Sequence, residues 1–478
     1  MSDAVSQSHV HYDFAVIGAG PAGQKAAVQA AKLGKRVLLV DREGAVGGEC
    51  VHRGTIPSKA LRHSAQQLAA VRGPEGAWMQ ASLADGTTVP GLMHRLDAVL
   101  RAHEQYMGRQ IERNGVAHVQ GRARFVSPRE LEIERPRAGK LCVGADFVLV
   151  ASGSRPRVPP GIPVDHEHVL DSDSILSLLY LPKSLLVLGA GIIACEFASI
   201  FQALGVRVTI VDKAPVPMGF LDADLSAAYV RAFEQAGGTF LAGRGVAAVD
   251  VDPLGWVVAQ LDDGTSVRTE KMLCAQGRIA NLAGLNLEAV GLAPNKRGYL
   301  EVDAHCRTSV PSIYAAGDVI GPPALATAAM EQGRRAAQHA FGAGAALAPE
   351  SLPSGIYTIP ELATVGLSEA QALERHGGAL VGRAKYAELA RGQINGCPDG
   401  FIKLVTGPDG RRIVGCHIAG ESASELVHVA QIAMVAQLEV DAFVEQIFNF
   451  PTFAEGFRVA ALDVIARRAG ANSAQLAA

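Results

Sequence analysis

The sequence predicts an α/β protein in which one strand–helix–strand unit occurs twice and an α+β domain follows at the C-terminal end. Three observations lead to this fold class. First, 478 residues are too many for one core, and 49% hydrophobic with 19% charged residues suits large folded domains. Second, residues 13–41 and 184–212 align without a gap. Third, the stretch GAGAALAPE at residues 342–350 is typical of a linker and separates residues 351–478 from the rest.

The two aligned segments read DFAVIGAGPAGQKAAVQAAKLGKRVLLVD and SLLVLGAGIIACEFASIFQALGVRVTIVD. Each combines a short apolar strand, a glycine turn, an amphipathic helix closed by glycine, and a second apolar strand that ends in an acid. Gly18 permits a tight turn, Gly20 lets the backbone approach a pyrophosphate, and Gly23 allows close packing of helix and strand. The pyrophosphate would meet the positive end of the helix. The second copy carries Gly189, Gly191 and Ala194 at these places.

An acid closes each unit. Asp41 and Asp212 both follow the last small residue of the turn by 18 positions, where a carboxylate can accept hydrogen bonds from a ribose. The sequence therefore predicts two Rossmann-like dinucleotide-binding domains. Two dinucleotides in one chain suggest an electron carrier and its donor, namely a flavin and a nicotinamide.

Composition excludes several other classes of protein. A formal net charge of −3 with interspersed signs argues against nucleic acids and membrane surfaces as partners. The N-terminus lacks the basic and apolar regions of a secretion signal, and the apolar residues 177–201 are interrupted by proline, lysine and glycine, so no membrane span is expected. Seven scattered cysteines indicate reduced thiols in a cytoplasmic protein. Cys416–His417 lacks a second ligand pair, so we expect a core position and no metal site.

Further motifs, in order and spacing, resemble the pyridine nucleotide-disulfide oxidoreductase family over nearly the whole chain. They are VLVASGSRP at 148–156, SIYAAGDV at 312–319, IPSK with Lys59, CE with Glu196, and GIYTIPELATVGLSE from residue 355. The resemblance implies that Asp318 binds the ribityl chain of FAD and that Lys59 and Glu196 pair beside the flavin. It also implies a helix start near residues 324–327 at the flavin's pyrimidine edge, and a homodimer whose C-terminal segment reaches the partner's active site.

The resemblance assigns two sets of cofactor residues. The set expected to bind FAD is Gly18, Gly20, Gly23, Asp41, Arg42, Gly48, Lys59, Gly153, Asp318 and Ala326. The set expected to bind NAD(H) or NADP(H) is Gly189, Gly191, Ala194, Glu196, Asp212, Lys213 and Gly277. Lys59, Glu196 and Cys50 are the candidate catalytic residues.

Two parts of the family's thiol chemistry are missing. In the stretch GGECVHRGTIPSKALRH, Thr55 stands where the cysteine nearer the flavin would be, so Cys50 has no disulfide partner there. In FPTFAE, Phe450 stands where the proton-handling histidine would be, and a phenyl ring cannot act as acid or base. Cys50 is then either a packed thiol, which is favoured, or a residue that tunes the flavin. The loss of both parts argues against thiol chemistry as the function.

The remaining chemistry is hydride transfer. The same stretches resemble the transhydrogenase branch of the family, which implies ping-pong transfer from NADPH to NAD⁺ through flavin N5. The residues also allow an NADH-dependent diaphorase or quinone reductase, a dihydrolipoamide dehydrogenase-like protein, or a non-catalytic flavoprotein. Transhydrogenation requires that the site accept NADP(H) as well as NAD(H). Asp212 should repel the 2′-phosphate of NADP(H), and the only cation beside Asp212 in the sequence is Lys213.

The expected layout has four parts. Residues 1–155 form the FAD domain and residues 156–278 the NAD(P) domain. Residues 279–350 return to complete the FAD domain, and residues 351–478 form the interface domain. Sheets should be mostly parallel in the nucleotide domains and antiparallel in the interface domain.

Overall fold

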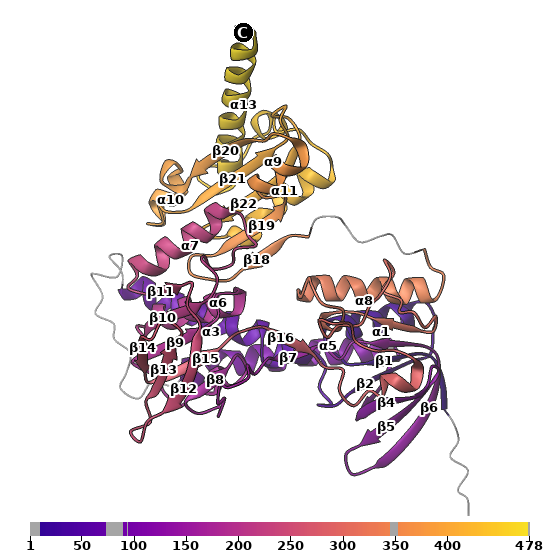
Figure 1. Ribbon diagram of the computed structural model, residues 1–478. Coiled ribbons are helices and arrows are strands. Elements are labelled where there is room, and N and C mark those ends of the chain that lie inside the picture. Colours follow the sequence, from indigo (N-terminus) through magenta and orange to yellow (C-terminus); the bar gives the residue numbers. More distant parts are fainter. Residues whose placement is uncertain (1–9, 73–88, 93, 345–351, 477–478) are drawn as a thin grey trace, which may run out of the picture. The chain divides into compact units, whose positions relative to one another are not determined.

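The computed structural model describes residues 10–72, 89–92, 94–344 and 352–476. These residues group into two compact units (Figure 1). Unit 1 comprises residues 1–60, 93–157 and 277–350, and unit 2 comprises residues 61–92, 158–276 and 351–478. The four-part layout expected from the sequence stays a prediction.

A seven-stranded mixed sheet forms the centre of unit 1. Strands β3 (Ala117–Gln120), β2 (Val37–Asp41), β1 (Val10–Ile17), β6 (Gly139–Val150) and β17 (Ile313–Ala315) run parallel. The antiparallel strands β5 (Glu130–Arg135) and β4 (Arg122–Ser127) extend the sheet beyond β6. Alternate residues of β1 face opposite sides, so that Phe14 and Val16 join one hydrophobic cluster and Ala15 and Ile17 join the other.

Helices α1 (Pro21–Lys32) and α8 (Ala326–Ala340) lie side by side in unit 1 (Figure 1). Small residues allow this close approach, since a Cβ on Gly333 would lie 2.1 Å from the carbonyl oxygen of Ala22. The other elements are α2 (Gly48–His52), α5 (His94–Arg113), η3 (Leu287–Val290), η4 (Asp318–Ile320) and the pair β7 (Ser154–Pro156) with β16 (Arg278–Ala280). Helix α3 (Thr55–Arg72) begins in unit 1 and continues into unit 2.

Unit 2 contains a second parallel sheet, in the order β11 (Thr239–Ala242), β10 (Arg207–Asp212), β9 (Ser184–Leu188), β15 (Lys271–Cys274) and β8 (Val169–Asp171). Beside it lies an antiparallel sheet of β12 (Val246–Val251), β13 (Val257–Leu261) and β14 (Ser266–Thr269). The helical elements here are α4 (Val89–Leu92), η2 (Ser174–Ser177), α6 (Ile192–Ala203) and α7 (Ala223–Gln235).

The C-terminal part of unit 2 is built on an antiparallel sheet. Its order is β18 (Ser354–Ile356), β19 (Leu362–Gly366), β22 (Ile413–Ala419), β21 (Phe401–Thr406) and β20 (Leu380–Lys385). Around it are α9 (Glu369–His376), η5 (Tyr386–Glu388), α10 (Ala390–Ile394), α11 (Ala423–Val435), α12 (Ala442–Glu445) and α13 (Glu455–Leu476).

The fold class predicted from the sequence is confirmed, including parallel sheets behind both glycine turns and an antiparallel C-terminal sheet. Residues 177–201 form a strand and a helix joined by the second glycine turn, as predicted. Among the residues that the structure describes, no helix is long and apolar enough to cross a membrane.

Candidate nucleotide-binding sites

The first glycine turn joins β1 to α1. Gly18 has φ +107°, and a Cβ there would lie 2.2 Å from the carbonyl oxygen of Ala151, so both conformation and space require glycine. The backbone N–H of Ala19 donates to Oδ2 of Asp41 at 2.8 Å. Gly20 is the N-cap of α1, and no side chain caps it. The turn thus leaves backbone donors at a helix N-terminus, which favours a phosphate.

Helix α2 covers this turn. Gly48 has φ +58°, and a Cβ there would lie 2.8 Å from the Cα of Gly20, so two glycine backbones are in contact.

Asp41 also accepts from the N–H of Glu43 at 2.9 Å through Oδ1. A carboxylate offers about four acceptor sites, so capacity remains for ribose hydroxyls.

Arg42 lies at the edge of this site. Its guanidinium pairs with Glu43 at 3.2 Å and with Glu49 at 3.4 Å. The second carboxylate oxygen of Glu49 is buried and has no hydrogen-bond partner among the described residues. A ligand hydroxyl or a water that reaches this oxygen would satisfy it.

Asp318, the residue expected at the ribityl chain, is held by a chain of two donors. The hydroxyl of buried Ser154 donates to Oδ2 of Asp318 at 2.5 Å. Arg278 donates from Nε to that hydroxyl at 2.7 Å and from Nη2 to the carbonyl of Ser154 at 2.9 Å. Gly153, with φ +72°, directly precedes Ser154. Sequence reasoning missed the contribution of Ser154 and Arg278, which depends on the pairing of β7 with β16.

Cys50 lies in α2 and has no disulfide partner, because all seven cysteines are free. Burial raises the pKa of the Cys50 thiol, and this outweighs the opposing effects of the Thr55 hydroxyl, which hydrogen-bonds it, and of Lys59. A thiol with a raised pKa is a poor nucleophile. Thr55 is thus a hydrogen-bond partner of the Cys50 thiol and not a redox partner.

The remaining expected residues of unit 1 occupy helix starts. Lys59, on α3, lies 3.4 Å from the hydroxyl of Ser58. Ala326 is the first residue of α8, whose N-cap has no side-chain hydrogen bond. Free N–H groups at a helix N-terminus stabilise negative charge on a neighbouring group.

The second glycine turn joins β9 to α6 and repeats the first. Gly189 has φ +114°, and the N–H of Ala190 donates to Oδ2 of Asp212 at 2.8 Å. Oδ1 of Asp212 accepts from the N–H of Ala214 at 2.7 Å. A Cβ on Gly191 would meet no atom of the described residues within 4 Å, so this turn is open at Gly191, whereas the backbone of Gly48 lies against Gly20 in the first turn. In both units the loop after the second strand contacts the turn, because the N–H of Gly47 donates to the carbonyl oxygen of Ala19 and the N–H of Met218 donates to that of Ala190, each at 2.8 Å. Ala194 is fully buried in α6.

Glu196 is buried on α6, and its Oε1 accepts from the backbone N–H of Tyr357 at 2.8 Å. One turn later, the hydroxyl of Ser199 accepts from the N–H of Ile359 at 3.1 Å. Helix α6 is thereby attached to the segment before β19. Glu196 belongs to unit 2 and Lys59 to unit 1, so their expected pairing stays a prediction. Gly277, with φ +97°, begins the last segment of unit 1.

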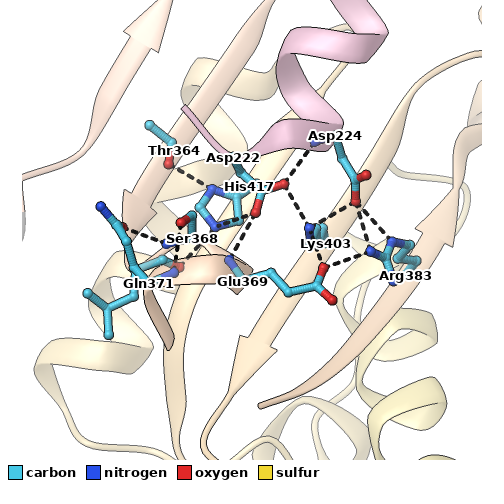
Figure 2. A network of polar contacts seen from close by, with 10 residues as sticks. Asp222, Asp224, Thr364, Ser368, Glu369, Gln371, Arg383, Lys403 and His417 are labelled. Atoms are coloured by element: carbon cyan, nitrogen blue, oxygen red, sulfur yellow. Dashed lines mark hydrogen bonds and ion pairs between the residues drawn. The ribbon is translucent and has the colours of Figure 1, made fainter. Parts of the chain in front are cut away.

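A buried polar network holds the loop that follows Lys213 (Figure 2). At its centre, Nζ of Lys403 lies 2.7 Å from Oδ1 of Asp222, with both side chains 2% exposed. Oδ1 of Asp222 accepts from the N–H of Asp224 at the start of α7, and Oδ2 accepts from the N–H of Glu369 at the start of α9. One carboxylate therefore serves two helix N-termini and an ammonium group.

Lys403 also contacts Asp224 at 2.9 Å and Glu369 at 2.8 Å. Burial alone would lower the pKa of Lys403, but its hydrogen bonds to these carboxylates raise it overall. The ammonium group is therefore charged at neutral pH. Removing it would leave a buried carboxylate without its counter-ion.

His417 completes this network as a neutral side chain. Its Nε2 lies 3.0 Å from the carbonyl oxygen of Leu367, which can only accept, so Nε2 carries the proton. Nδ1 then accepts from the hydroxyl of Thr364 at 2.8 Å. Burial lowers the pKa of His417 against the pull of nearby Asp222. Among the described residues no cluster could hold a metal ion, and Cys416 and His417 are core residues as predicted.

At the C-terminal end, Phe450 is 72% exposed, and Glu455 begins α13. The carboxylate of Glu455 has one buried oxygen without a hydrogen-bond partner in the described part of the chain. Neither residue supplies an imidazole. The proton-handling group of a thiol mechanism is therefore missing at this position.

A duplicated dinucleotide fold followed by an antiparallel C-terminal sheet places the protein in the class of pyridine nucleotide oxidoreductases. The chain belongs to the pyridine nucleotide-disulphide oxidoreductase family, whose model matches residues 12–333, and the family's dimerisation domain matches residues 352–461. It is 41% identical over 462 residues to soluble pyridine nucleotide transhydrogenase of Mycobacterium tuberculosis, covering 96% of this chain and 98% of the relative. It is 38% identical over 459 residues to the protein of that name from Hahella chejuensis, covering 95% and 98%.

Solved structures with the same fold include LpdA from Mycobacterium tuberculosis, with a TM-score of 0.87 and 26% identity over 95% of this chain and 99% of that one. The HOCl-induced flavoprotein disulfide reductase RclA from Escherichia coli has a TM-score of 0.85 and 25% identity over 94% and 99%. The family predicted from the motifs is confirmed.

Proposed function

We propose that this protein is an FAD-dependent pyridine nucleotide transhydrogenase that moves hydride between NADPH and NAD⁺ without a redox disulfide. The observation that carries the proposal is that one chain contains both a covered and an open glycine turn. In addition, the hydrogen-bond partner of Cys50 is the hydroxyl of Thr55 and not a second thiol. The relatives named soluble pyridine nucleotide transhydrogenase support the same activity.

The residues of unit 1 fit FAD. At the α1 N-terminus, Gly18, Gly20 and Gly48 keep the turn free of side chains, and the N–H groups of this helix start, which no side chain caps, favour a pyrophosphate. Asp41 has acceptor capacity for a ribose, and Asp318 is oriented by Ser154 to accept from hydroxyl groups. When bound, FAD would supply the group that accepts a hydride from one pyridine nucleotide and returns it to the other.

The residues of unit 2 bind the exchanging nucleotide. Gly189 and Gly191 leave the N-terminus of α6 accessible to a pyrophosphate, and Asp212 accepts hydrogen bonds from the adenosine ribose. Because the turn is open, one nucleotide can leave and the other can enter the same site. No side chain has to carry a proton in this cycle, which agrees with the exposed Phe450.

We also propose that the protein acts as a homodimer in the cytoplasm. The dimerisation domain supports this, as do the exposed apolar side chains of Ile432 and Val435 on α11 and of Leu462 on α13. The site residues of both sets, the pairing of Lys59 with Glu196 and the four-part domain layout belong to the same proposal.

An anaerobic two-step titration tests the activity. The purified protein is mixed with a roughly stoichiometric amount of NADPH, the loss of visible flavin absorbance is followed, and NAD⁺ is then added. Bleaching by NADPH followed by full recovery with NAD⁺ is the expected result. Bleaching by NADH alone, with recovery only on adding a quinone, would replace the proposal with a diaphorase. Dependence of turnover on the Cys50 thiol would restore disulfide chemistry.

A further inference from the structure

Arg244, which follows β11, lies close to the expected coenzyme site at the end of β10 although it is distant from that site in sequence. Asp212 pairs with Ala242 in the parallel ladder, so the residues after both strands meet at one edge of the sheet. The backbone N–H of Arg244 donates to the carbonyl oxygen of Asp212 at 3.0 Å. Arg244 therefore lies beside the acid that should face the adenosine ribose.

Lys213 lies over the same corner. A Cβ on Gly245 would come within 2.3 Å of Cε of Lys213 and within 3.2 Å of its Nζ, so the lysine covers this glycine. Oδ2 of Asp262 would lie 2.8 Å from the same Cβ, so a carboxylate shares this corner with the ammonium group. Two cations, one on each strand end, thus flank Asp212.

Arg244 already has a counter-ion. Its Nε lies 3.1 Å from Oδ2 of Asp263, with side chains 40% and 33% exposed. Asp263 belongs to the turn between β13 and β14, where it accepts from the N–H and hydroxyl of Thr265. The N–H of Asp262 donates to the carbonyl oxygen of Gly245 at 2.9 Å, which fixes this turn against the loop of Arg244.

We propose that Arg244 and Lys213 form the subsite for the 2′-phosphate of NADP(H), and that Asp263 competes with this phosphate for Arg244. The inference rests on the proposed function and explains how one site takes both coenzymes. With NAD(H), Asp212 accepts from the ribose diol and Asp263 neutralises Arg244. With NADP(H), the phosphate replaces Asp263 as the partner of Arg244, and Lys213 offsets its repulsion from Asp212.

If Asp263 and the 2′-phosphate compete for Arg244, substitutions of Arg244 and of Asp263 should have opposite effects on phosphate binding. Arg244→Ala removes the phosphate's partner, whereas Asp263→Asn releases Arg244 and keeps the acceptor oxygen of the turn. The probes are adenosine 2′,5′-bisphosphate and adenosine 5′-monophosphate, which differ only by the 2′-phosphate. Binding to the FAD-loaded enzyme is measured by calorimetry at low and high salt. Arg207→Ala is the matched control, since it lies at the opposite end of β10, roughly 16 Å from Asp212 at 3.3 Å per residue.

Arg244→Ala should weaken the bisphosphate about tenfold and change the monophosphate less than about twofold. Asp263→Asn should tighten the bisphosphate about threefold, and added salt should reduce both effects. The control should leave both ligands unchanged. Equal effects of Arg244→Ala on the two probes, or weaker bisphosphate binding by Asp263→Asn, would overturn the subsite.

These experiments distinguish failure of the proposed phosphate subsite from failure of the proposed transhydrogenase activity. Selective loss of bisphosphate binding in Arg244→Ala, in an enzyme that never returns hydride from NADPH to NAD⁺, would keep the subsite and reject the transhydrogenase. Hydride transfer from NADPH with an unchanged ratio of KM for NADPH to KM for NADH in Arg244→Ala would do the reverse. Unaltered FAD content and thermal midpoint in each variant exclude misfolding as the cause.

Discussion

The two glycine turns share one backbone and differ in what covers them. Gly18 and Gly189 have φ values of +107° and +114°, and Gly20 and Gly191 both cap a helix in extended conformation. In both turns, the acid at the end of the second strand accepts from the middle alanine at 2.8 Å. The local sequence therefore determines the same geometry twice.

The surroundings separate the two turns. In unit 1 the turn is covered by Gly48, and a Cβ on Gly23 would lie 1.8 Å from the carbonyl oxygen of Gly18. In unit 2 nothing among the described residues lies within 4 Å of a Cβ on Gly191, and Ala194 replaces the third glycine. A covered site suits a cofactor that stays, and an open site suits a substrate that leaves in each cycle.

The largest effect is expected from Lys403→Met, which disturbs the support of the open turn. Removing one partner of a buried ion pair costs about 3–5 kcal/mol, because Asp222 would keep its charge at 2% exposure. Chemical denaturation should show this loss, with FAD content kept and KM raised for both nucleotides. Arg411→Ala, which breaks an exposed pair with Glu439, is the control and should cost about 1 kcal/mol or less. Similar losses in the two variants would contradict a supporting role for this network.

Exchanging the third small residue between the turns should have the next largest effect. Gly23→Ala forces a methyl group against the backbone of Gly18, and overpacking of this kind costs about 1–3 kcal/mol. Ala194→Gly costs about 1 kcal/mol through lost helix propensity. The thermal midpoint and the FAD content of the purified proteins measure the difference. Loss of FAD from Ala194→Gly but not from Gly23→Ala would reverse the assignment of the two sites.

Gly48→Ala and Gly191→Ala each add one methyl group beside a glycine turn, and each should weaken the binding of the nucleotide at that turn. Gly48→Ala must place a side chain at φ +58° and against Gly20, so the helix start that would hold the pyrophosphate of FAD is available only at a cost of about 1–2 kcal/mol, and FAD should bind about tenfold more weakly. Gly191→Ala has normal φ and free space, so the fold and FAD content should be kept while KM rises for NADH and NADPH alike. Fluorescence titration of FAD and steady-state kinetics report the two outcomes. An unchanged KM in Gly191→Ala would remove the second turn from the coenzyme site.

The sequence predicted the two glycine turns but not the residues that contact them, and the reason is physical. Gly18, Gly189 and the two acids act through contacts within one strand–turn–helix unit, so a local pattern is enough to find them. Arg244 and Ser154 act through the register of strands distant in sequence, and a β ladder leaves no local signal of its partner. Lys403 is a lone charge in the apolar strand β21, and only the fold places it against Asp222. The fold class and glycine turns could thus be predicted, and the groups that tune them could not.

The smallest predicted effect is a pH dependence of stability from His417, which belongs to the network that supports the open turn. Burial lowers the pKa of His417 in the folded state, so the unfolded chain binds its proton first as the pH falls below about 6.5. The stability that neutral His417 contributes is complete above that pH and is lost as the pH falls through the lowered folded-state pKa. Each unit of difference is worth about 1.4 kcal/mol. Relative to His417→Phe, the wild-type protein should therefore lose more stability between pH 7.5 and 5, as followed by urea unfolding at about half-unit steps. A protonated His417 could no longer accept the hydrogen bond of Thr364, and its charge would be repelled by Lys403. Parallel pH profiles for the two proteins would mean that the imidazole is not held neutral.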